Sequence, residues 1–156
     1  MNPLERYQAD LKRPEFFHDA AQETAVRHLQ RLYDDLIAAE KGSSGVFGKL
    51  FARKPQGPVK GLYFWGGVGR GKTYLVDTFF DALPFERKVR THFHRFMKRV
   101  HEEMRTLKGE KNPLTIIGKR FADEARVICF DEFFVSDITD AMILATLLEE
   151  LFKNGV

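Results

Sequence analysis

The stretch that decides the fold is Gly61-Leu62-Tyr63-Phe64-Trp65-Gly66-Gly67-Val68-Gly69-Arg70-Gly71-Lys72-Thr73. An apolar run typical of a strand leads into the pattern G-x-x-x-x-G-K-T, and a helical run follows, which is the context of a Walker A phosphate loop. The glycines free the backbone to turn N–H groups toward an anion, and the helix N-terminus adds partial positive charge. The stretch predicts binding of a nucleoside triphosphate.

The expected nucleotide contacts come from this loop and the first helical turn after it. We expect Lys72 to reach the β- and γ-phosphates as a binding and catalytic residue, and the Thr73 hydroxyl to bind Mg²⁺. The competing interpretation is a glycine-rich turn that happens to precede a lysine, and the strand and helix on either side count against it. The residues expected to contact the nucleotide are Gly66, Gly67, Val68, Gly69, Arg70, Gly71, Lys72, Thr73 and Tyr74.

A second apolar run ends in two acids and reads Arg126-Val127-Ile128-Cys129-Phe130-Asp131-Glu132. It is typical of a strand buried on both faces, which would bring Asp131 to the sheet edge where ligands bind in open α/β sheets. We expect Asp131 to hold Mg²⁺, mostly through its waters, and Glu132 to polarise the water that attacks the γ-phosphate. Taken alone, a solvated strand end is the more common reason for such a pair.

These stretches resemble the ZapE cell-division ATPases, bacterial relatives of a mitochondrial ATPase raised during lactation. The more specific matches are His92-Phe93-His94-Arg95-Phe96-Met97, Cys129-Phe130-Asp131-Glu132-Phe133 and the run from Asp137 to Leu144. The resemblance covers most of the chain from about Pro14 and implies an AAA-like P-loop ATPase that uses ATP and Mg²⁺. It also implies a cytoplasmic protein, recruited to the division site, that acts on the tubulin-like ring protein. Self-association into a dimer or ring is a separate expectation.

Composition is ordinary for a globular protein, at 44% hydrophobic and 30% charged residues with a net charge of +3. The sequence has no run of roughly 18 uncharged apolar residues, so any membrane contact is expected to be peripheral. The single cysteine, Cys129, lies in the second apolar run. We interpret it as a small core residue rather than a nucleophile.

Three regions are expected along the chain. Residues 1–40 form an N-terminal arm, extended to about Phe17, and a helix with Asp19 as N-cap. Residues 41–60 form a linker rich in Gly, Ser and basic residues, and 61–156 form the N-terminal portion of a P-loop core. In that core the expected strands are 62–65, 89–94 and 126–130, and the expected helices are 72–83, 95–107, 113–123 and 136–153.

Alternating strands and helices indicate an α/β fold with a doubly wound parallel sheet flanked by helices. Asn154-Gly155 is typical of a helix stop, and Val156 would begin a fourth strand. By the family resemblance that strand lies between the first and third, so we expect a core truncated before its fourth strand and a chain that hydrolyses ATP poorly on its own. The sensor residue and arginine finger are expected outside this chain.

Other features allow more than one interpretation. His92 and His94 favour packing over metal binding, because two ligands are too few for a metal site. The basic run from Arg87 to Lys108 includes Phe93 and Phe96 and could follow nucleic-acid phosphates, although Glu102 and Glu103 are spaced to pair with Lys98 and Arg99 in a solvated helix. Four phenylalanines, Phe79, Phe80, Phe133 and Phe134, are expected mostly in the core. In the segment from Asp19 to Thr24, Gln22 is suited either to an adenine edge or to helix capping.

The leading hypothesis is an ATPase that remodels a protein partner. The first alternative is a nucleic-acid-linked ATPase of the helicase-loader type, which the basic helix supports; nucleic acid is the less favoured partner. The second is an adaptor that binds ATP but scarcely hydrolyses it. The acids Asp131 and Glu132 favour hydrolysis over the adaptor.

Overall fold

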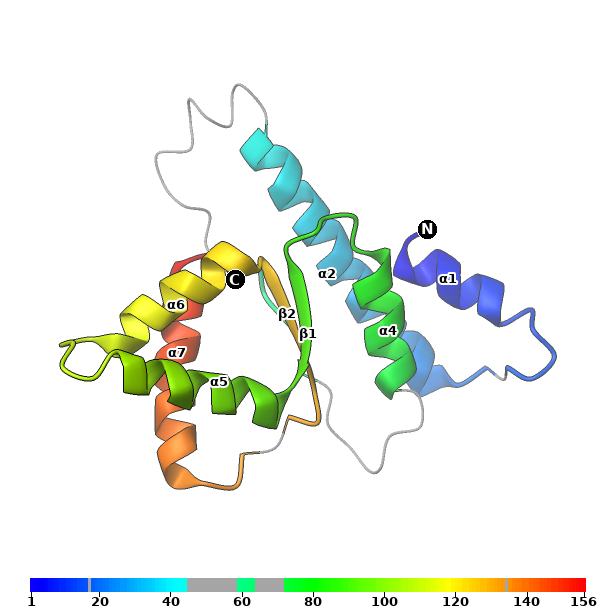
Figure 1. Cartoon of the computed structure of the whole chain (residues 1–156). Coiled ribbons are helices and arrows are strands. Elements are labelled where there is room, and N and C mark those ends of the chain that lie inside the picture. The colour runs from blue at the N-terminus through cyan, green and yellow to red at the C-terminus, as the bar shows by residue number, and fades with distance from the viewer. Residues whose placement is uncertain (17, 45–58, 64–71, 134) are drawn as a thin grey trace. The chain divides into compact units, whose positions relative to one another are not determined.

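The computed structural model describes residues 1–16, 18–44, 59–63, 72–133 and 135–156 (Figure 1). These residues form two compact units, divided between Phe85 and Glu86. None of the described helices is both long and apolar enough to cross a membrane.

The first unit begins with a helix, α1 (Pro3–Asp10), where an extended arm was expected. The Asn2 side chain accepts a hydrogen bond from the Glu5 N–H, and the Glu5 carboxylate accepts one from the Asn2 N–H, which together form a capping box. Pro3 occupies the first helical turn, where a missing N–H costs nothing. The expectation of an extended arm is therefore wrong for these residues, and Tyr7 is buried at 1% exposure.

The long helix α2 (Ala20–Ser44) packs with α1 and with α4 (Lys72–Ala82). The Asp19 carboxylate accepts hydrogen bonds from the N–H groups of Ala21 and Gln22, which confirms Asp19 as the N-cap. The helix reaches Ser44, beyond the expected boundary at residue 40. The buried side chains of α2 and α4 are Val26, Leu29, Leu32, Leu36, Leu75, Thr78 and Phe79.

The predicted first strand, 62–65, falls partly on described residues. Leu62 and Tyr63 are not in a strand, and Phe64 and Trp65 lie outside the described residues. Of the expected linker 41–60, residues 41–44 belong to α2 and residues 45–58 lie outside the described residues, as do Gly66 to Gly71 of the phosphate loop.

The second unit contains β1 (Lys88–His92), α5 (Phe93–Thr106), α6 (Pro113–Glu124), β2 (Val127–Asp131) and α7 (Ile138–Lys153). The two strands are parallel, with Lys88 opposite Val127 and His92 opposite Asp131. This arrangement confirms an α/β fold with a parallel sheet. The apolar run predicts that β2 is buried on both faces, but every residue of β2 is only partly buried. The reason is that the sheet formed by the described residues has two strands.

The strand expected over 89–94 ends at His92, because α5 begins at Phe93. Burial of one face of α5 stabilises the helix from Phe93 onward, although the alternating pattern of the residues before it predicts that the strand continues. His94 is therefore helical, and its ring stacks on that of His92 with 5.7 Å between centroids. The buried residues of this face are Phe93, Phe96, Met97 and Val100.

The core of the second unit joins α5, α6 and α7, which lie to one side of the two strands (Figure 1). Helix α6 runs very close to α7 at Gly118, where an added Cβ would lie 2.7 Å from the Glu150 Cβ. Helix α7 begins at its N-cap Asp137 and ends near Gly155, which has a φ of 83°. The buried core residues on these helices are Phe93, Phe96, Met97, Val100, Ile117, Phe121, Leu144, Leu147 and Leu151.

Candidate functional site

Lys72 and Thr73 open α4, as the phosphate-loop prediction requires. Leu75, Thr78 and Phe79 anchor the helix by their burial in the first unit. The first four N–H groups of a helix have no partner within it, and its N-terminus carries partial positive charge. The first turn of α4 thus has the chemistry to bind an anion, with the Thr73 hydroxyl as a hard oxygen for a divalent cation.

Tyr74, the last of the predicted nucleotide contacts, has its side chain engaged elsewhere. Its hydroxyl donates a hydrogen bond to the Asp10 carboxylate at 2.5 Å, and its ring packs against Phe16 with 5.2 Å between centroids. Burial and the neighbouring Asp10 raise the pKa of the Tyr74 phenol to about 12. A contact between Tyr74 and a nucleotide would therefore use the main-chain N–H in the first helical turn.

Asp131 ends β2 and forms a two-point ion pair with Arg90 of β1. The Arg90 Nε donates to Oδ2 at 2.9 Å and Nη2 donates to Oδ1 at 3.1 Å, with the two side chains 22% and 21% exposed. A carboxylate has about four lone-pair sites, so each oxygen can still accept a further hydrogen bond. The carboxylate therefore fits a metal bound through its waters, the role expected for Asp131.

Glu132 has a backbone conformation that side-chain-bearing residues rarely adopt, with a φ of 54°. This left-handed conformation costs on the order of 1–2 kcal/mol for a residue with a Cβ. It interrupts the strand alternation directly after Asp131 and leaves the Glu132 side chain exposed. Strain of this kind is concentrated at functional sites, which supports a role for this carboxylate.

An aromatic cluster fixes the strand end on either side of Glu132. The Phe130 ring lies 4.8 Å from Phe96 and 5.9 Å from Phe93, and the Phe133 ring lies 4.6 Å from Phe93, measured between centroids. The expectation that Phe133 packs in the core is confirmed, whereas Phe134 lies outside the described residues. Burial raises the pKa of the Cys129 thiol to about 11, in line with a packing role.

The predicted site residues fall in both units. Lys72 and Thr73 belong to the first unit, and Asp131 and Glu132 belong to the second. Sequence reasoning did not identify Arg90 as the partner of Asp131, although Arg90 stood within the basic run. No sequence signal identified this pair, since it follows from the parallel register, in which Arg90 lies opposite Cys129, two residues before Asp131.

Half of the predicted pairing on α5 is wrong. Arg99 does pair with Glu103, at 3.5 Å, and also with Glu124 at 2.5 Å. Lys98 forms no ion pair with Glu102 within the part of the chain that the structure describes. The Arg99 guanidinium also lies over the Phe121 ring, 4.4 Å from its centroid, and so forms a cation–π contact with a core residue of the second unit.

Comparisons with known proteins agree with the motifs. The family model for AFG1-like ATPases matches residues 1–156. Cell division protein ZapE of Escherichia coli K12 is 47% identical over an alignment that covers 100% of this chain and 44% of that protein. Lactation elevated protein 1 homolog B of Danio rerio is 43% identical over 64% of this chain and 22% of its own length. No solved structure matches the chain.

These similarities confirm the resemblance to ZapE. The chain spans less than half the length of these relatives. Because the family model extends over the whole chain, the chain belongs to the AFG1-like ATPase family.

Proposed function

We propose that this chain contributes the phosphate-binding and water-activating residues of a Mg²⁺-dependent ATPase. The observation that carries the proposal is the end of β2, where Asp131 is oriented by Arg90 and Glu132 follows in a left-handed conformation. The loop Gly66 to Thr73 leads into α4 in the same chain, and family membership supports the same activity.

Each residue has a distinct part in the proposed reaction. The N–H groups of the loop and of the first turn of α4 bind the phosphates, and Lys72 neutralises charge on the β- and γ-phosphates. Mg²⁺ would supply charge neutralisation between those phosphates, with Thr73 and Asp131 as the residues that hold it. Glu132 accepts a proton from the attacking water and orients it.

The test separates binding from hydrolysis. We expect Lys72→Ala to abolish saturable binding of Mg·ATP in calorimetry, with Lys12→Ala, an exposed lysine of the same unit, as the matched control. Glu132→Gln should keep ATP binding and lower turnover by about 10²–10⁴-fold, since it removes a general base. The control is Glu149→Gln, an exposed carboxylate on α7. Normal function in Glu132→Gln despite lost turnover would instead favour the adaptor, and full turnover in this variant would show that Glu132 is not the general base.

We further propose that hydrolysis drives remodelling of a protein partner in cell division. The E. coli relative is named a cell division protein, and the ZapE resemblance implies a tubulin-like ring protein as the partner and a cytoplasmic location with recruitment to the division site. We also propose that the protein self-associates into a dimer or ring. A sedimentation assay with that polymer tests this directly. ATP-dependent loss of polymer, absent with Glu132→Gln, is the expected result.

Nucleic-acid binding is the second candidate because several cations of α5 are exposed, among them Arg95, Lys98 and Arg105. A nucleic-acid-linked ATPase would show DNA-stimulated turnover and an affinity that falls steeply with salt. Neither effect is expected if a protein partner is the target.

A further inference from the structure

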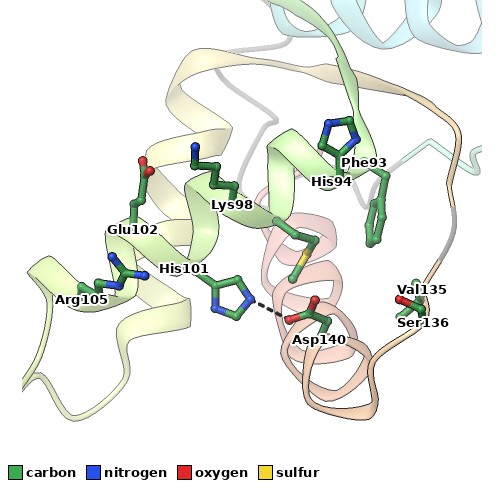
Figure 2. A pocket seen from close by; sticks show the side chains of 10 residues that line it. Phe93, His94, Lys98, His101, Glu102, Arg105, Val135, Ser136 and Asp140 are labelled. Carbon is green, nitrogen blue, oxygen red and sulfur yellow. Dashed lines mark hydrogen bonds and ion pairs between the residues drawn. The ribbon is translucent and has the colours of Figure 1, made fainter.

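A pocket of about 450 Å³ lies in the second unit, between α5 and the segment that leads from β2 into α7 (Figure 2). Apolar surface at the pocket comes from Phe93 and Met97, which are 4% and 3% exposed, and from half-buried Val135. Ser136 and Asp140 line the side opposite α5. The pocket therefore offers a small apolar contact area within a polar setting.

Two cations of α5 line the same pocket and are exposed to solvent. Lys98 and Arg105 are seven residues apart, which places them about 10 Å apart along the helix axis. Within the described ranges neither forms an ion pair. The neighbouring Arg99, by contrast, is fully engaged with Glu103 and Glu124.

The carboxylates of the pocket do not neutralise these cations. Asp140 is taken up by His101, whose Nε2 lies 2.6 Å from Oδ1 (Figure 2). This pair joins α5 to the first turn of α7 and braces one side of the pocket. Glu102 is the other acid of the lining and is exposed. Lys98 and Arg105 thus remain available to a ligand of opposite charge.

We propose that this pocket binds an acidic segment of a partner protein. Two carboxylates of the segment, about 10 Å apart, would meet Lys98 and Arg105, and an apolar side chain between them would cover Phe93, Met97 and Val135. His94, also in the lining, adds a hydrogen-bonding group at one end.

A protein segment fits the pocket better than nucleic acid does. A run of phosphates carries one charge per nucleotide and offers no apolar side chain to the surface at Val135 and at the exposed edges of Phe93 and Met97. A segment with two spaced carboxylates places no charge between Lys98 and Arg105 and uses this apolar surface. Ionic contacts at an exposed rim are individually weak, so the apolar contact is needed for useful affinity.

The docking site goes beyond the proposed ATPase activity and does not depend on it. The pocket wall at Val135 and Ser136 nevertheless follows closely after Asp131 and Glu132 in the chain. A bound segment would therefore contact the same connection that carries the proposed water-activating residue. Binding is measured without nucleotide, so that failure of one proposal leaves the other standing.

The experiment measures binding of a fluorescent, end-capped peptide, Asp-Gly-Phe-Leu-Glu, to the intact protein by anisotropy at low salt. The double variant Lys98→Glu with Arg105→Glu should weaken binding by about fivefold or more, because both rim contacts become repulsive. The matched control reverses two exposed lysines away from the pocket, Lys111→Glu with Lys119→Glu, and so changes the net charge equally. Melting curves check that both variants stay folded.

Replacement of the anchor provides a second variant on the ligand side. A peptide with Ser in place of Phe and Leu should bind at least about threefold more weakly if the apolar surface is used. Equal weakening by the pocket and control reversals would overturn the proposal, as would the absence of peptide binding at 1 mM. Binding of a twelve-residue oligothymidine through Lys98 and Arg105, with no peptide binding, would assign the surface to nucleic acid instead.

Discussion

The ion pair between Arg90 and Asp131 should stabilise the second unit in the absence of metal, and a double-mutant cycle can measure by how much. The variants are Arg90→Gln, Asp131→Asn and the two combined. Two hydrogen bonds to charged groups join the side chains, at 2.9 and 3.1 Å. Such bonds contribute about 1.5–3 kcal/mol each when well protected from solvent.

The exposure of the two side chains sets the expected size. At 22% and 21% exposure, they lie between a surface pair, at about 0.2–1 kcal/mol, and a buried pair, at about 3–5 kcal/mol when one partner is removed. We therefore expect a coupling energy of about 1.5–3 kcal/mol for the two-point contact. The cycle cancels other contacts that each side chain makes, provided that they are independent.

The assay is urea denaturation of the intact protein in EDTA, read by circular dichroism. A second cycle on Arg31 and Asp35 is the matched control, since this pair is also close, at 3.1 Å, but 39% and 50% exposed. An exposed i,i+4 pair should couple by about 0.3–0.5 kcal/mol. A coupling energy for Arg90 and Asp131 no larger than that of the control would refute the inference that Arg90 holds the carboxylate in place.

Three further changes test the packing around the proposed site. Gly118→Ala should lower the free energy of unfolding by about 1–2 kcal/mol, because the clash with Glu150 at 2.7 Å outweighs the gain in helix propensity; a rise in Tm would contradict this. Tyr74→Phe should cost about 1–2 kcal/mol in urea denaturation, because it removes the donor to buried Asp10. In the unchanged protein the raised pKa of the Tyr74 phenol stabilises the fold fully below pH 10, and this stabilisation is lost as pH rises toward 12. Tyr74→Phe should abolish this pH dependence of the unfolding free energy. Glu132→Gly should stabilise the fold by up to about 1 kcal/mol while turnover is lost, and a destabilised variant would show that φ 54° is not strained.

Local signals predicted most of the helices because the information lies within a few residues. Pro113 in the first turn of α6 and Gly155 after the end of α7 have the predicted roles, whereas α7 begins at Ile138 behind the N-cap Asp137 and not at the expected Ser136. The start of α4 at Lys72 follows from the same reasoning. Each of these boundaries depends on backbone groups that a nearby residue satisfies or frees.

The errors arose where a local pattern supported two structures. Asn2 and Glu5 have the spacing of a capping box, but the proline between them favoured an extended arm. The local pattern around Thr91 and His92 favours a strand that continues to residue 94. The strand ends at His92 because the residues from Phe93 onward bury one face as a helix. In both cases tertiary packing selected the outcome, through Tyr7 in the first unit and Phe93 in the second.

The contacts that orient the site depend on register, which a single sequence does not contain. Arg90 reaches Asp131 because the strands are parallel and start with Lys88 opposite Val127. A shift of one residue would turn Arg90 to the other face and break the pair. The same limit applies to His101 and Asp140, which meet only because α5 and the first turn of α7 come together.

The strained conformation of Glu132 can persist because its neighbours are fixed on both sides. Asp131 is held by the Arg90 guanidinium, and Phe133 packs against Phe93 and Phe130. With both flanking side chains anchored, the residue between them keeps its positive φ, and the packing of the cluster offsets the cost. The backbone of Glu132 is thereby held in place, and its side chain is exposed to solvent. A fixed backbone directs the Cα–Cβ bond of the proposed water-activating residue before substrate binds, which lowers the free energy needed to order the carboxylate during the reaction.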